Sequence, residues 1–220
     1  MKTKLFALIL LMFAGVTSQT KAQISECAIE YSVEVKGGDM DPMAAAMMEG
    51  MTMTMMFKDD QARVEMDMSM GTTISVVDAG EKKGVVLMDM MGMKMAMPMG
   101  PEEFADAEDE DKDPNVKITN KTKKIAGYTC KQAIITDEDG SKYEIWYTPE
   151  IKVNAQGTDY DYGEIDGFPL EMETKQDDMK VKMIAQDVST KKLSSDLFDM
   201  SIPAGYTEMT PEMIQQMGGN

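Results

Sequence analysis

The chain has 220 residues and a formal net charge of −17, with 27 Met, a single Arg and no His. This length is enough to bury a hydrophobic core in one or two domains. The absence of His excludes catalytic triads that use an imidazole, and it excludes zinc sites with imidazole ligands. The negative charge predicts no binding to nucleic acids or to anionic membrane surfaces, because phosphate groups repel an acidic chain.

Residues 1–22 have the pattern of a secretory signal peptide. Lys2 and Lys4 precede an apolar run at 5–16, which is too short to span a bilayer as a helix. A small-x-small cleavage site follows, so we expect the mature chain to begin at Gln23 and to be periplasmic or secreted. No later stretch is apolar enough to span a bilayer, which predicts that the chain is not an integral membrane protein.

Cys27 and Cys130 both fall in the expected mature chain. An even number of cysteines in an exported protein favours a disulfide between them. Such a bridge would close a loop of about a hundred residues, which chain entropy makes worth about 4–5 kcal/mol. The alternative is a pair of buried free thiols.

Alternation of apolar and polar residues dominates the first half of the chain. Residues 27–35 alternate without a fault, which predicts a half-buried strand that ends at Gly37 and Gly38. Asp41 and Pro42 are typical of the start of a short helix that ends before residue 50. Across residues 51–99 the alternation returns between polar turns, which predicts an antiparallel meander of about five strands.

An acidic run at 101–115 interrupts this pattern, and we expect an exposed loop there. It has no glycine at which a calcium-binding loop could turn, so we predict no calcium site. The second half again alternates, and we expect residues 23–209 to form a single domain. The predicted elements are two hairpins, a helical turn and a short C-terminal helix or tail, at 128–136 with 142–148, 170–175 with 180–188, 194–198 and 210–220.

Several short segments of the second half carry a family resemblance. In their order along the chain they resemble secreted bacterial proteins of domain-of-unknown-function family 4412, over most of residues 24–209. Arg63, followed by alternating apolar positions, matches the family's first half. The segments are 125–131 (IAGYTCK), 144–149 (EIWYTP), 167–172 (GFPLEM), and 197–198 (LF) followed by 203–206 (PAGY).

That family is similar in predicted architecture to the periplasmic lipoprotein carriers LolA and LolB. The resemblance implies a mainly β fold with some α structure: a strongly curved antiparallel sheet that forms an unclosed half-barrel. Short helices would act as a lid over an apolar cavity. The resemblance implies no activity and no catalytic residue. The chain departs from the family in how much methionine fills its first half.

Eighteen of the 27 Met lie between residues 40 and 99. They could simply fill core positions. Because Met is flexible and a weak strand former, they could instead line an adaptable cavity for an apolar ligand. Strand parity places a set of them on the concave face, where we expect a ligand site together with the only Trp. The predicted lining residues are Met53, Met55, Met66, Met68, Met95, Met97 and Trp146.

A metal site is the alternative. Thioethers select Cu(I) and Ag(I), and residues 88–99 form a dense Met-x-Met array. Neighbours on one face of a strand lie about 6–7 Å apart, a gap that Met side chains can close around one ion. The lack of His and a buried position of the sulfurs would argue against copper. The candidate ligands are Met88, Met90, Met93, Met95 and Met97.

The sequence thus favours an exported, monomeric, non-enzymatic protein that holds a lipid or another apolar small molecule and needs no cofactor. A periplasmic Cu(I)- or Ag(I)-binding protein, with copper bound by thioethers, is the first alternative. A structural surface domain without a ligand is the second.

Overall fold

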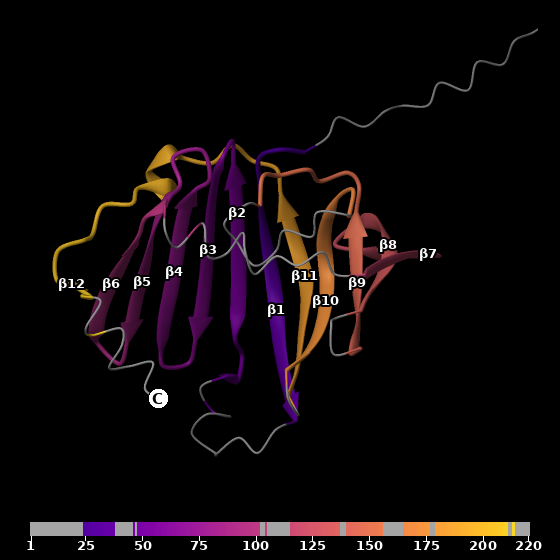
Figure 1. Cartoon of the computed structure of the whole chain (residues 1–220), viewed down its shortest axis with the longest axis horizontal. Helices are drawn as coiled ribbons and strands as arrows, with labels where there is room; N and C mark the ends of the chain where they lie inside the picture. Colours follow the sequence, from indigo (N-terminus) through magenta and orange to yellow (C-terminus); the bar gives the residue numbers. More distant parts are fainter. Residues whose placement is uncertain are drawn as a thin grey trace, which may run out of the picture.

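The computed structural model describes residues 24–37, 46, 48–101, 104, 115–136, 140–155, 165–176, 179–210 and 213. Within these residues twelve strands form one sheet, in the order β12-β6-β5-β4-β3-β2-β1-β11-β10-β9-β8-β7 (Figure 1). The strands are β1 (Cys27–Gly37), β2 (Thr52–Lys58), β3 (Gln61–Met68), β4 (Gly71–Asp78), β5 (Lys83–Met90), β6 (Met93–Met99), β7 (Asn115–Ile125), β8 (Tyr128–Thr136), β9 (Lys142–Thr148), β10 (Phe168–Gln176), β11 (Met179–Ser189) and β12 (Thr207–Glu208).

Two meanders make up this sheet, and β1 joins them. β2 to β6 pair in chain order as antiparallel neighbours, and so do β7 to β11. β1 pairs with β2 on one side and with β11 on the other. The short β12 adds a parallel strand beside β6. The predicted mainly antiparallel β fold is confirmed, with twelve described strands where the sequence suggested about ten.

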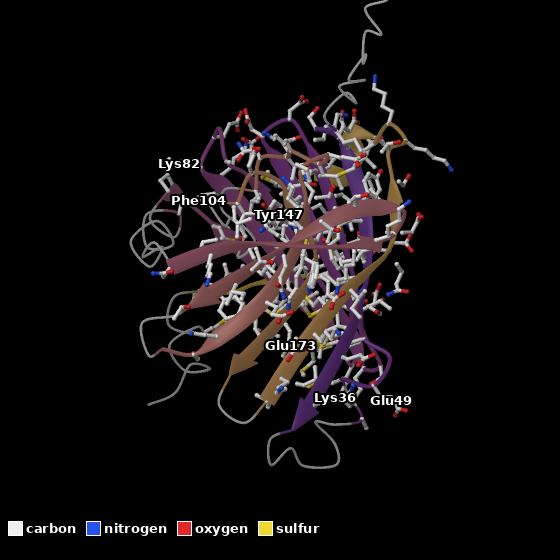
Figure 2. All side chains as sticks on the ribbon, turned by 90° about the vertical axis from the view of Figure 1, so that its right-hand side faces the viewer. Lys36, Glu49, Lys82, Phe104, Tyr147 and Glu173 are labelled. Carbon is white, nitrogen blue, oxygen red and sulfur yellow. The ribbon has the colours of Figure 1, made fainter. Side chains whose placement is uncertain are left out.

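The sheet is strongly curved and does not close. In Figure 1, β7 and β8 lie at one side, across the direction of their neighbours, and Figure 2 shows the same end from that side. There β7 approaches β11, although three strands separate the two in the sheet. At this curled end of the sheet, Lys123 on β7 also forms an ion pair of 2.5 Å with Glu171 on β10. The predicted unclosed curved sheet is therefore present.

One face of the sheet, which we call the inner face, carries the main hydrophobic core. Because side chains alternate along a strand, the inner positions of β1 are Cys27, Ile29, Tyr31 and Val33, all buried. The rings of Phe57 on β2 and Phe168 on β10 meet edge to face at 4.9 Å between centroids. Further buried side chains come from outside the strands, among them Phe104, Ile151, Ala155 and Ile165.

The opposite face, which we call the outer face, has its own smaller core over β4 to β6. Val76, Val85, Leu87 and Ala96 are buried there under Phe198 and its neighbours in the C-terminal segment 193–206. The segment includes the short 3-10 helix η1 (Ser195–Phe198), whose first turn is capped by the Ser194 side chain. It covers the outer face, so it is not the helical lid expected over the apolar inner face.

The other predicted helices are only partly described. Ala46 and Met48 are helical, as is Met213 in the expected C-terminal helix. Most of the acidic run and the predicted signal peptide lie outside the described residues. In the part of the chain that the structure describes, no helix is long and apolar enough to cross a membrane.

Candidate ligand-binding face

The inner face of β2 to β6 is lined by methionine in regular rows. The pairing of neighbouring strands forms one row across the sheet, which runs through Met53, Met66, Thr73, Met88 and Met95. The next row toward the hairpin ends runs through Met68, Gly71, Met90 and Met93. Strand parity therefore gathers the methionines of four strands on one surface, as the sequence predicted.

The methionines of these rows differ in exposure between the centre of the sheet and its β6 side. Met53 and Met55 on β2 are 1% and 0% exposed and belong to the main core. Met66 and Met68 on β3 are half-buried and pack against that core. Met93 on β6 is 63% exposed. The methionine face is thus closed at β2, half-buried on β3 and β5, and most exposed at Met93, next to the β5–β6 turn.

Five methionines of β5 and β6 are not part of the packing described above. In the described part of the chain they belong to neither hydrophobic cluster. Four of them are half-buried and one is exposed. Such apolar side chains on a sheet face are available to a ligand. They are Met88, Met90, Met93, Met95 and Met97.

Short side chains on β4 separate the methionines of β3 from those of β5. Gly71, Thr73 and Ser75 occupy the inner positions of this strand. A Cβ atom on Gly71 would lie 2.8 Å from the Sδ atom of Met90, so the thioether of Met90 fills the space over the glycine. Met68 and Met90 are therefore neighbours across a strand that carries little side-chain volume.

The predicted lining set is only partly brought together. Met66, Met68, Met95 and Met97 share the open or half-open inner face. Met53 and Met55 lie on the same face, but they are sealed in the core and cannot contact a ligand without rearrangement of their neighbours. Sequence parity fixes the face of a residue, but it does not show how far the core extends across the sheet.

Trp146 lies on the other face, so it is not part of the methionine surface. It alternates with the buried Ile145 and Tyr147 on β9. The Lys123 ammonium group lies 4.1 Å from the centroid of its ring and also binds Glu171. Lys182 binds the same carboxylate at 3.2 Å. Trp146 is held by a cation–π and ion-pair cluster next to the curl of β7.

Cys27 and Cys130 are both buried free thiols. Cys27 occupies an inner position of β1, opposite Phe57. The pairing of β1 with β11, and of β11 with β10, β9 and β8 in turn, places Ala133 of β8 on the inner face. Side chains alternate along a strand, so Cys130, three residues before Ala133, occupies an outer position. The structure does not confirm the predicted disulfide, because both thiols are free and strand parity directs them to opposite faces, whereas a bridge needs side chains that point toward each other.

Arg63 and Glu65 both lie at outer positions of β3, where an exposed salt bridge would contribute little to stability. The Arg63 side chain is, however, only 15% exposed. Its Nη1 atom donates a hydrogen bond of 2.9 Å to the carbonyl oxygen of Leu197, while Nε donates to Glu65. Lys58 likewise donates to the carbonyl oxygen of Leu193 at 3.0 Å. These cations hold the C-terminal segment on the outer face.

Comparisons with known proteins place this geometry in context. No curated protein matches the chain. A solved structure of PNGF-II is similar over 88% of this chain, with a TM-score of 0.50 and 16% identity, and the match spans 33% of that protein. The chain thus corresponds to about a third of that relative's length, and the likeness shows the fold alone.

Two further solved structures are more distant. A crystal structure of MucB matches over 84% of this chain and 59% of its own length, with 10% identity and a TM-score of 0.44. An uncharacterized conserved protein from Thermus thermophilus matches over 84% of this chain and 91% of its own length, with 8% identity and a TM-score of 0.47.

A family profile supplies the firmest comparison. It matches residues 38–156, which is more than half of the chain and spans the whole methionine-rich meander from β2 to β6. The motifs at 125–131 and 144–149 also fall inside the matched range, whereas those at 167–172, 197–198 and 203–206 lie beyond it. The chain belongs to the family described as Domain of unknown function (DUF4412).

Proposed function

We propose that this chain is an exported, non-enzymatic binding protein that holds a lipid acyl chain or a similar apolar molecule on its methionine-lined inner face. The contact surface consists of half-buried or exposed methionines on β3, β5 and β6, chiefly Met66, Met68, Met88 and Met95. The protein would act in the periplasm or outside the cell, and as a monomer. We also propose a LolA-like arrangement, in which short helices lie over the apolar inner face.

One observation carries the proposal: the methionine rows continue beyond the edge of the packed core. Met53 is buried at 1% exposure, whereas Met88 and Met95, in the same row, are half-buried and lie outside both cores. An apolar face that continues beyond the packed core is typical of a binding surface. A ligand seated there would complete the burial that the core begins.

The chemistry of methionine suits a ligand of variable shape. The side chain is unbranched, with three rotatable bonds and a polarizable sulfur, so it adapts to different apolar partners. The short side chains of Thr73 and Ser75 in the middle of the face leave an acyl chain room to approach the backbone of β4, whereas Met90 covers Gly71. The methionines of β3 and β5 lie on either side of that strand, because β4 pairs with both.

A fluorescent fatty-acid probe tests this proposal. In the variant Met88→Ser/Met95→Ser the fold should persist, but the apolar contact is reduced. Loss of about 60 Å² of apolar contact weakens binding by about 1.5 kcal/mol, which is roughly tenfold in the dissociation constant. We therefore expect saturable binding of the probe by the wild type and at least about tenfold weaker binding by the Ser variant.

Matched controls separate apolar contact from damage to the fold. Met88→Leu/Met95→Leu keeps a similar volume and should bind the probe within about threefold of wild type, because such swaps usually cost less than about 1.5 kcal/mol. Met200→Ser removes a methionine from the outer face and should leave probe binding unchanged. Equal binding by all four proteins, or no saturable binding by the wild type, would contradict the proposal.

A further inference from the structure

The hairpin of β5 and β6 sets its methionines directly opposite one another. Met91 and Gly92 form the two-residue turn, with φ of 55° and 85°. Positive φ at both positions is typical of a type I′ turn, which fixes the register of the two strands. That register pairs Met90 with Met93, and Met88 with Met95.

These four methionines share the inner face, because they alternate with Asp89 and Lys94 at the outer positions. Directly opposite residues in an antiparallel pair have Cα atoms about 4.5–5.5 Å apart, and neighbours along a strand about 6.5–7 Å apart. The Sδ atom of Met90 already lies on this face, against Gly71. Four flexible thioethers thus stand within reach of one point above the hairpin.

This cluster is also open. Met93 is 63% exposed, and Met88, Met90 and Met95 are half-buried outside both hydrophobic cores. The sequence alone argued against a metal site because the sulfurs were expected to be buried. The structure removes that objection for the hairpin, where an ion could reach the sulfurs without disturbing the core.

We propose that the Met88, Met90, Met93 and Met95 thioethers bind one soft monovalent cation, Cu(I) or Ag(I). Thioethers are soft, neutral donors that select these ions over Zn²⁺, Mg²⁺ and Ca²⁺. Within the described ranges no group of three or more His, Cys, Asp or Glu residues offers a rival site for harder ions. The net charge of −17 favours the approach of a cation. This inference does not depend on the apolar ligand proposed above.

Titration with Ag(I), as silver nitrate in chloride-free buffer, tests the site by calorimetry and native mass spectrometry. We expect one Ag(I) bound per wild-type chain. The variant Met88→Leu/Met90→Leu/Met93→Leu/Met95→Leu should bind it at least about a hundredfold more weakly, because Leu offers no donor atom. Thioethers have no proton to release, so the wild-type affinity should change less than about threefold between pH 5 and 8.

Controls make each outcome decisive. Met56→Leu/Met200→Leu, on the outer face, should bind Ag(I) as the wild type does. The quadruple variant keeps both cysteines, so silver that binds their thiols would persist in it, and undiminished binding there would overturn the site. If the quadruple variant fails to fold, Met88→Leu/Met95→Leu and Met90→Leu/Met93→Leu should each weaken binding about tenfold. Absence of Ag(I) binding by the wild type would also overturn it, whatever the result with the fatty-acid probe.

Discussion

The hydroxyl group of Tyr31 on β1 donates a buried hydrogen bond of 2.7 Å to the carbonyl oxygen of Pro169 on β10. The register of β10 against β9 shifts directly after Pro169, and this bond crosses β11 to fix that irregular point. In Tyr31→Phe the ring remains but the buried carbonyl loses a donor. We expect a loss of about 1–2 kcal/mol in the free energy of unfolding. An unchanged urea midpoint would show that the bond does not contribute.

Arg63 should matter more than an exposed cation does. It joins Glu65 on β3 to the carbonyl oxygen of Leu197 in the C-terminal segment. Arg63→Met should destabilise the fold by about 1.5–3 kcal/mol, since it breaks hydrogen bonds made by a charged, half-buried group. It should also speed proteolysis within residues 193–206. The matched control Lys36→Met breaks only an exposed pair with Glu34 and should cost less than about 1 kcal/mol.

The alternation of apolar residues predicted the local strands well. Residues 27–35 were expected as a strand and form most of β1, and the meander of β2 to β6 follows the predicted order. The sequence did not reveal that β1 pairs with β11, because that contact joins residues more than 140 positions apart. Local periodicity carries no information on such pairings.

The second apolar face was also missed, although a signal for it exists. Val76 follows Ile74 at outer positions of β4, and Val85 and Leu87 do the same on β5. Apolar residues at both inner and outer positions indicate a strand buried on both faces. The C-terminal segment 193–206 covers the outer face of these strands. Trp146 alternates with the buried Ile145 and Tyr147 on β9, so it lies on the face opposite to the methionines and not among the other predicted lining residues.

Gly71 should be intolerant of any side chain. A Cβ atom there would collide with the carbonyl oxygen of Asp89 and would lie 2.8 Å from the sulfur of Met90. Gly71→Ala should therefore destabilise the protein by about 1–3 kcal/mol, as overpacking does. The control Gly80→Ala meets only side-chain atoms, at 3.3 Å or more, and should cost less. Equal thermal midpoints for the two variants would contradict this account of the β4–β5 contact.

The two thiols should be unreactive in the folded protein. Burial raises the pKa of Cys27 to about 12 and that of Cys130 to about 11, so little thiolate exists at pH 8. We expect iodoacetamide to label neither cysteine in the native protein and both in urea without reductant. Failure to label either in urea would show that a disulfide forms after export.

The same shifts give a sign for the pH dependence of stability. Unfolded thiols ionise near pH 9, whereas the folded thiols hold their protons to higher pH. The unfolded state therefore binds fewer protons above pH 9, and the stability of the fold should fall as the pH rises from 9 toward 12. Below about pH 8 the thiols should add no slope. Cys27→Ala should reduce the alkaline slope in urea unfolding measured at several pH values.

Native mass spectrometry of the protein, purified without detergent from the cells that export it, tests the central claim most directly. The account predicts a mature chain that begins at Gln23 and carries an apolar molecule, seen as a mass increment that organic extraction removes. The Met88→Ser/Met95→Ser variant, purified in the same way, should carry much less of it. A wild-type chain that is always recovered without any such increment, and that takes up no fatty acid afterwards, would contradict the account.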